Sequence, residues 1–324
     1  MHMTGCQVLL SQRGNHTRRI KFFKYMFMLC YPYQEEILLD FAMYLVKDHK
    51  NITEAFELMN GKSTKTPLNN NKLLQAYMGL FEYILWKTKD LKERRSRNSI
   101  GVDMEGHDME LKQNDNIYHA NKALQFFDKL VENEGVWDVF VMRQVELLMF
   151  FERNNEAQTI LERYREKNPE NPNTHRYLYS FHKLQDAPKS TLLAVLENLF
   201  TVNPTSELVQ EYYELVMDKE TISDFNKNIC TLFGLLFSKL DYHSCKTSLV
   251  DWKALTHILH ICNHDNPINK GIDDKVKACW DERADWWPDY HFSVAMVTTS
   301  LSSHDFNVTL EKAKVAKYLL SKGL

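Results

Sequence analysis

Residues 157–204 read AQTILERYREKNPENPNTHRYLYSFHKLQDAPKSTLLAVLENLFTVNP, and their apolar side chains recur every three or four positions. Side chains at i, i+3, i+4 and i+7 share one face of an α-helix, whereas a half-buried strand alternates polar and apolar residues. The helical spacing occurs at Ala157, Ile160, Leu161 and Tyr164, and again at Leu192, Val195, Leu196 and Leu199. The stretch therefore predicts amphipathic helices that each bury one face against a neighbour.

The same spacing extends outward from this stretch, at 52–59, 73–84, 120–127 and 209–216, and no segment sustains a period of two. Glycine and proline are scarce, with 10 and 8 residues in a chain of 324. Their combined share is roughly half the usual value. Because β-strands must be joined by frequent turns rich in these residues, their scarcity favours long helices. The expected fold class is all-α, with stacked antiparallel helix pairs.

A weak internal repeat is also present. Ala157, Leu161, Tyr164 and Pro169 recur about 35 residues later as Leu192, Leu196, Leu199 and Pro204. A tetratricopeptide repeat has a period of about 34 residues and similar offsets in its second helix, but its first-helix signature is absent here. The repeat therefore indicates either a tetratricopeptide-like solenoid or two unrelated helical hairpins of similar length.

Helix-breaking residues and changes in composition along the chain suggest five parts. Four of the eight prolines follow asparagine, a good helix cap, so these dipeptides are expected at joints between helices. Residues 91–116 carry almost no aromatic or β-branched residues and predict a flexible linker or exposed loop. The expected parts are an uncertain N-terminal segment 1–30, a helical block 31–90, the linker 91–116, a helical-repeat block 117–264 and a C-terminal helical block 265–324.

Charge and composition exclude several protein classes. The net charge is -3, which argues against nucleic-acid binding over the whole surface but permits a local patch such as the basic run at 92–97. That run is interpreted as an import signal, a phosphate contact or a solvated linker. No apolar run reaches the ~18 residues of a membrane span, the apolar stretch at 22–30 is interrupted by Lys24, and six scattered cysteines fit a reducing compartment.

Candidate metal ligands gather in the last third of the chain: His257, His260, Cys262, His264 and Cys279. Three histidines share a helical face, as zinc ligands can, but the alternative is a helix with solvent-facing histidines. A helical metal-dependent hydrolase based on His264 and Asp265 is a further alternative that lacks recognisable additional ligands. No nucleophile elbow or phosphate-binding glycine loop is present. We therefore expect no catalytic residues, metal, cofactor or small-molecule substrate.

An aromatic cluster is the strongest candidate site, and it holds half of the six tryptophans. Aromatic side chains dominate both protein cores and binding hot spots. The cluster is therefore expected either to close the end of the helical stack or to bind a partner. The candidate interface or structural residues are Trp280, Trp286, Trp287, Pro288, Tyr290, His291 and Phe292, together with Trp137.

Two strings of the chain are distinctive. The first is GVWDVFV at 135–141, which contains Trp137 and is followed by NPNTH at 171–175 and YLYSF at 177–181. The second is WDER at 280–283 with WWPDYHFS at 286–293. In order and spacing, these strings resemble the A-type subunit family of the RNA polymerase I-specific TATA-binding-protein-associated factors. Residues 33–90 resemble the family more loosely, and residues 1–30 do not resemble its N-terminal region.

The resemblance implies a non-enzymatic, helical scaffold subunit of the promoter selectivity complex that contains the TATA-binding protein. Such a protein would act in ribosomal RNA gene transcription initiation, in the nucleus and nucleolus, through protein–protein contacts. Its partners would be the TATA-binding protein and the other associated factors, with at most a weak contact to promoter DNA. The alternative from the repeat pattern is a generic tetratricopeptide-like adaptor that binds a peptide.

Overall fold

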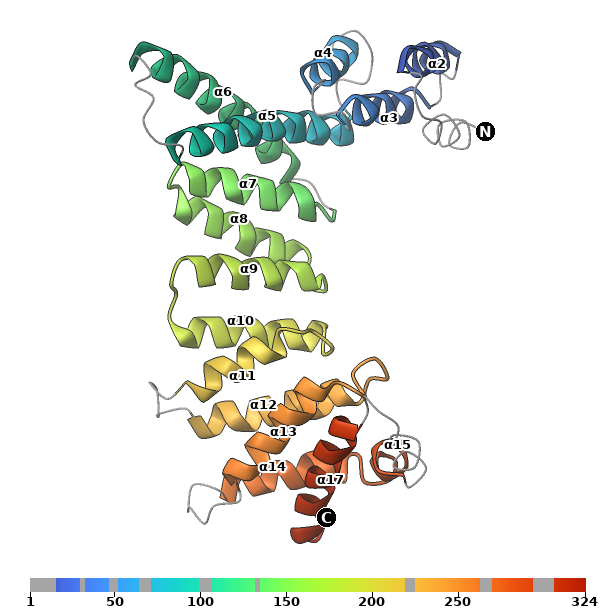
Figure 1. Cartoon of the computed structure of the whole chain (residues 1–324), viewed down its shortest axis with the longest axis vertical. Coiled ribbons are helices and arrows are strands. Elements are labelled where there is room, and N and C mark those ends of the chain that lie inside the picture. Colours follow the sequence, from blue (N-terminus) through green and yellow to red (C-terminus); the bar gives the residue numbers. More distant parts are fainter. Residues whose placement is uncertain are drawn as a thin grey trace. The chain divides into compact units, whose positions relative to one another are not determined.

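A computed structural model describes residues 16–29, 33–46, 52–63, 71–98, 106–131, 135–218, 225–262, 270–293 and 306–324. Every regular element in these residues is a helix, as expected from the spacing of apolar residues (Figure 1). The chain divides into an N-terminal unit, Met1–Asn168, and a C-terminal unit, Pro169–Leu324. The helices of the N-terminal unit are α2 (His16–Leu29), α3 (Gln34–Val46), α4 (Ile52–Ser63), α5 (Lys72–Asn98), α6 (Gly106–Val131), α7 (Asp138–Phe150) and α8 (Asn154–Lys167). Those of the C-terminal unit are α9 (Pro172–Leu184), α10 (Lys189–Val202), α11 (Val209–Met217), α12 (Phe225–Leu240), α13 (Leu249–Cys262), α14 (Lys270–Asp281), α15 (Trp287–His291) and α17 (Phe306–Ser321).

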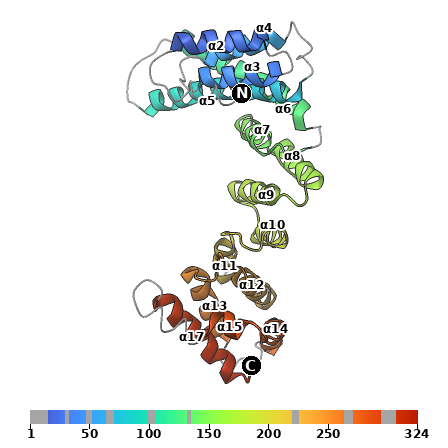
Figure 2. The ribbon, with the colours of Figure 1, turned by 90° about the vertical axis from the view of Figure 1, so that its right-hand side faces the viewer.

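The N-terminal unit is built around the long pair α5 and α6, which lie side by side (Figure 1). A Cβ added at Gly79 of α5 would lie 2.8 Å from Phe126 Cβ and 2.9 Å from Phe127 Cε1, so the pair approaches closely only because this residue is glycine. Helices α2, α3 and α4 pack in succession toward α5 (Figure 2). Phe23 of α2 stacks on Phe41 of α3, with ring centroids 5.0 Å apart, and anchors this layer in the core.

The hairpin of α7 and α8 completes this unit, and one tyrosine fixes its geometry. Tyr164 of α8 is buried. Its hydroxyl accepts a hydrogen bond of 2.8 Å from the backbone N–H of Trp137 and donates one of 2.7 Å to the Asp138 carboxylate. The start of α7 is therefore held against α8 by side-chain hydrogen bonds as well as by apolar packing.

The C-terminal unit begins with successive packing of α9, α10, α11 and α12. Helix α12 also packs against α13 and α14, and α13 packs against α17. The wholly buried rings of Phe233, Phe237, Trp252 and Trp287 form the centre of this half of the unit. Burial of such large rings removes much apolar surface from water and so stabilises the unit.

Three of the Asn-Pro dipeptides lie at joints between helices, as expected, but only Asn171 caps the start of a helix. Pro172 lies in the first turn of α9, and the side chain of Asn171 accepts a hydrogen bond of 3.0 Å from the Asn173 backbone N–H. Asn168 and Asn203 are the C-caps of α8 and α10. The fourth dipeptide, Asn266-Pro267, lies outside the described residues.

Residues 91–116 were expected to form a linker or loop, but their backbone is helical wherever the structure describes it. Helix α5 continues to Asn98, and α6 begins at Gly106. The physical reason is composition: in 91–98 six of the eight residues are Leu, Lys, Glu or Arg, which have high helix propensity, and neither 91–98 nor 107–116 contains Gly or Pro. Residues 99–105, and the side chains of the basic run at 92–97, lie outside the description.

The division between the two units falls inside the block expected at 117–264, and the five-part organisation stays a prediction. The tetratricopeptide-like repeat also stays a prediction, although neighbouring helices do pack in succession within each unit. Among the described helices, none combines the length and the apolar character that a bilayer span requires.

Candidate functional site

Trp287 is the centre of the aromatic cluster. It opens α15 and is wholly buried. Its ring stacks on Phe237 of α12, with centroids 4.5 Å apart and an interplanar angle of 7°. Trp252 of α13 lies 6.1 Å away in a tilted arrangement. Trp287 therefore lies where α12, α13 and α15 meet, and its ring belongs to the core of the C-terminal unit.

The other expected members surround Trp287 at different depths. Trp280 and Trp286 meet it edge-on, at 6.5 and 6.4 Å between centroids, and Trp286 is 39% exposed. Pro288 lies in the first turn of α15 and is exposed. Tyr290 and Phe292 are half-buried, and Lys246 lies 4.0 Å above the Tyr290 ring. The cluster thus has a buried centre and an accessible rim.

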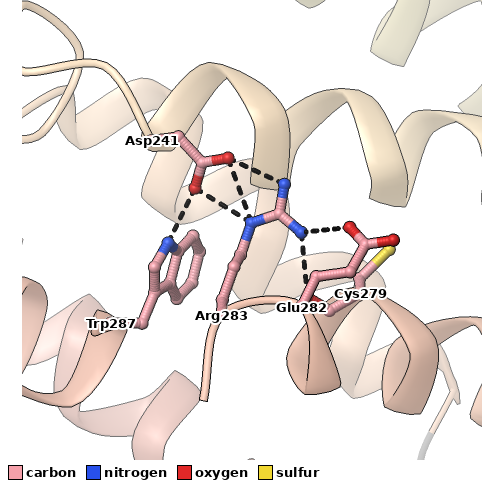
Figure 3. Close-up of polar contacts among 5 residues, drawn as sticks. All are labelled: Asp241, Cys279, Glu282, Arg283 and Trp287. Atoms are coloured by element: carbon pink, nitrogen blue, oxygen red, sulfur yellow. Dashed lines mark hydrogen bonds and ion pairs between the residues drawn. The ribbon is translucent and has the colours of Figure 1, made fainter. Parts of the chain in front are cut away.

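Arg283 joins the cluster to the ends of α12 and α14. Its guanidinium donates to both oxygens of Asp241, at 2.7 Å from Nη2 to Oδ2 and 2.9 Å from Nε to Oδ1. Trp287 Nε1 donates to Asp241 Oδ1 at 2.7 Å. Figure 3 shows Arg283 between Trp287 and Asp241 on one side and Glu282 and Cys279 on the other. Such a two-pronged pair with added hydrogen bonds satisfies a charge that would be costly to bury alone.

Burial lowers the pKa of Arg283, but the hydrogen bonds and charge of Asp241 outweigh it, so the pKa is raised. The guanidinium therefore carries its charge at any physiological pH. It donates further to the Cys279 carbonyl oxygen at 2.9 Å and to Glu282 Oε2 at 3.0 Å. These contacts fix the turn between α14 and α15.

His291 lies at the end of α15 and is 1% exposed. Neither ring nitrogen makes a hydrogen bond of good geometry. Burial, together with the positive charges of Lys312 and Lys246, lowers its pKa to about 3. The imidazole is therefore neutral at physiological pH and packs as an aromatic ring, 4.6 Å from Trp287.

A surface groove of about 520 Å³ lies between α12 and α14, and Arg283 is among the residues that line it. Helix α12 lines it with Lys227, Cys230 and Gly234, and α14 and the turn after it contribute Lys275, Cys279 and Glu282. Burial raises the pKa of the Cys230 and Cys279 thiols, and the nearby Lys275 ammonium lowers both only in part. Both thiols are therefore protonated at neutral pH.

The candidate metal ligands are spread over different surroundings. His257 and His260 are exposed on α13, and His257 Nδ1 lies 2.7 Å from the Tyr213 hydroxyl. Cys279 lies in the groove, whereas the Cys262 side chain, His264 and Asp265 are outside the described residues. Within the described part of the chain, no group of three or more His, Cys, Asp or Glu residues could hold a metal ion.

Trp137 belongs to the N-terminal unit and is half-buried. Its ring packs 6.1 Å from Phe140, and its backbone N–H is held by Tyr164. This residue therefore shapes the start of α7 and is not a member of the cluster around Trp287.

Sequence reasoning missed Asp241, Phe237 and Trp252. Asp241 lies 46 positions before Trp287, and neither charge nor spacing at that position predicts the pairing. Arg283 had a local signal, because it ends the WDER string and lies only four residues before Trp287.

The family described as TAF RNA Polymerase I, A-type subunit, matches residues 2–324 of the chain. A Homo sapiens protein, named as the A-type subunit of the TATA box-binding protein-associated factor of RNA polymerase I, is 32% identical over 296 residues, which cover 89% of this chain and 62% of that protein. The Mus musculus protein of the same name is 30% identical over 297 residues, with the same coverage of 89% and 62%. The chain thus spans 62% of the length of these relatives. Because the family match covers nearly every residue, including both strings that carry the resemblance, the chain belongs to the A-type subunit family of the RNA polymerase I TAF proteins.

Proposed function

We propose that this chain is a component of the factor that brings the TATA-binding protein to RNA polymerase I promoters, and that it acts in transcription initiation in the nucleus and nucleolus. The observation that carries the proposal is the family match over residues 2–324, together with the names of the human and mouse relatives. Its partners would be the TATA-binding protein and the other associated factors, with at most a weak contact to DNA.

We infer that the chain works as a scaffold, through binding and not catalysis. The last helix supports this inference, because α17 is apolar on two sides. Val315 and Leu319 are buried on one side, while Phe306, Leu310 and Leu320 are 53%, 45% and 75% exposed and share another face. Large apolar side chains that gather on an exposed helix face often mark a contact with another protein, so this face fits such a contact.

Co-purification tests the proposal directly. The epitope-tagged chain is expressed in human cells, captured from nuclear extract at 150 and 400 mM salt, and probed for the TATA-binding protein. We expect the TATA-binding protein and the other RNA polymerase I-specific factors to remain at both salt concentrations, because the buried parts of protein interfaces depend little on salt. If the TATA-binding protein is absent at both concentrations, the proposal is wrong.

A second experiment tests the role of the chain in transcription initiation. Extract depleted of the human relative should regain transcription from a ribosomal RNA promoter when the chain is added with its partners, and an RNA polymerase II promoter should be unaffected. The variant Leu320→Glu places a charge on the exposed face of α17 and should weaken retention of partners. The control Lys277→Glu places a glutamate at an exposed position of α14, away from this face.

A further inference from the structure

The groove between α12 and α14 is a candidate binding surface with a definite size. Its volume of about 520 Å³ lies within the range of roughly 300–1,000 Å³ that is typical of ligand sites. Both walls are helices of the same unit, and α12 packs directly against α14. The groove therefore keeps its shape without help from the N-terminal unit.

One end of the groove carries two ammonium groups. Lys227 and Lys275 are both exposed and line it, and neither forms an ion pair with any residue that the structure describes. Lys275 lies across Gly234, because a Cβ at Gly234 would be 3.5 Å from Lys275 Cε and 3.8 Å from its Nζ. Its charge is thus held over the floor of the groove and attracts an anion there.

The other end of the groove offers no surplus of positive charge. Arg283 is paired with Asp241 and also contacts Glu282, whose side chain is 73% exposed. The positive charge available to a ligand is therefore concentrated at the end of Lys227 and Lys275. An occupant with a carboxylate at that end and a neutral or basic residue near Glu282 would match both ends.

The floor of the groove is made of small, neutral side chains. Cys230, Gly234 and Ser238 lie four residues apart, along one row of α12. Both groove thiols are protonated at neutral pH, so they do not offset the ammonium charges. Because Gly234 has no side chain, the Lys275 side chain can lie over this floor and present its ammonium group within the groove.

We propose that this groove binds a short acidic segment of a partner protein, with its carboxylates at Lys227 and Lys275. Following from the proposed function, the partner is another associated factor of RNA polymerase I. A DNA duplex fits less well, because proteins that bind DNA commonly make roughly 6–10 phosphate contacts, and two ammonium groups supply far fewer.

The first test measures peptide binding. Overlapping 15-residue peptides cover the acidic stretches of the other TATA-binding-protein-associated factors, and each has a matched peptide in which Glu and Asp are replaced by Gln and Asn. Fluorescence anisotropy with the whole chain should show at least one acidic peptide that binds ~10-fold more tightly than its neutral match. The variants Lys275→Glu and Gly234→Leu should each weaken it by ~10-fold or more.

The control Lys277→Glu makes the same charge change on the same helix, outside the groove, and should leave binding within about twofold. Circular dichroism must show that each variant keeps its helix content. The proposal is overturned if no acidic peptide is preferred, or if Lys277→Glu weakens binding as much as Lys275→Glu. It is also overturned if labelled DNA, and no peptide, binds in a way that depends on Lys275.

The second test repeats the co-purification with the variants. If the wild-type chain retains the factor and both Lys275→Glu and Gly234→Leu retain every component, the groove is not an interface although the proposed function stands. If the wild-type chain retains none of the factor, the proposed function fails, and the peptide measurement alone decides whether the groove binds acidic segments.

Discussion

Replacing His291 with phenylalanine should remove much of the acid sensitivity of the C-terminal unit. In the folded chain this imidazole has a pKa of about 3, because it is buried and lies near Lys312 and Lys246. In the unfolded chain its pKa is the ordinary value of about 6.5. As the pH falls below 6.5, the unfolded chain therefore takes up a proton that the folded chain refuses, and the free energy of unfolding decreases.

The size of the effect follows from the difference between the two pKa values. Each pH unit between them corresponds to about 1.36 kcal/mol, so at pH 5 the loss is about 1.5 times this value, or ~2 kcal/mol. The full loss, reached only near pH 3, is of order 5 kcal/mol. Above pH 6.5 both states are neutral and the contribution vanishes.

The assay is urea unfolding of the whole chain at pH 7.5, 6.5, 5.5 and 5.0, followed by tryptophan fluorescence. Between pH 7.5 and 5.0 the wild type should lose ~2 kcal/mol more unfolding free energy than His291→Phe, because every other titrating group is common to both. His243 is exposed, so the control His243→Gln should behave as the wild type. Equal losses in the wild type and His291→Phe would refute the reasoning.

Four further substitutions test the packing. Trp287→Ala should lower the unfolding free energy by ~3–5 kcal/mol, because it removes a wholly buried ring; unchanged stability with impaired partner binding would instead identify the cluster as an interface. Asp241→Ala should cost ~3 kcal/mol in urea unfolding, since it leaves the Arg283 charge, with a side chain only 9% exposed, without its main partner. Gly79→Ala should cost ~1–3 kcal/mol, because its Cβ would lie 2.8 Å from a side chain of α6. Gly234→Ala should instead raise the free energy of unfolding by up to ~1 kcal/mol, and with it the thermal midpoint, because the new Cβ would meet nothing closer than 3.5 Å. A lower midpoint would contradict this account.

The sequence predicted the fold class because, in most helices, apolar residues recur every three or four positions along the face that is buried. Ala157, Leu161 and Tyr164 are all buried as their spacing indicates. The extent of α5 and α6 was missed, because a helix made of charged residues with high propensity has no apolar stripe to reveal it. Composition distinguishes buried from exposed segments better than it distinguishes helix from loop.

For the candidate site, the sequence indicated which aromatic residues gather but not what holds them. Trp280, Trp286 and Trp287 are close in the sequence, so a cluster among them needs no tertiary information. The pairing of Asp241 with Arg283 spans 42 positions and depends on how α12 meets α14, which no local pattern encodes. The groove between these helices is equally a product of tertiary packing.

Cleavage by trypsin in the turn at 282–286 can report whether α15 is packed against the core of the C-terminal unit. Trypsin cleaves after arginine, but it must first draw the surrounding backbone into its cleft. Arg283 is 8% exposed, and its carbonyl oxygen accepts hydrogen bonds from the backbone N–H groups of Trp286 and Trp287, at 3.1 and 2.9 Å. Scission at this position therefore requires α15 to detach from the core, and its rate in limited proteolysis measures how often that detachment occurs.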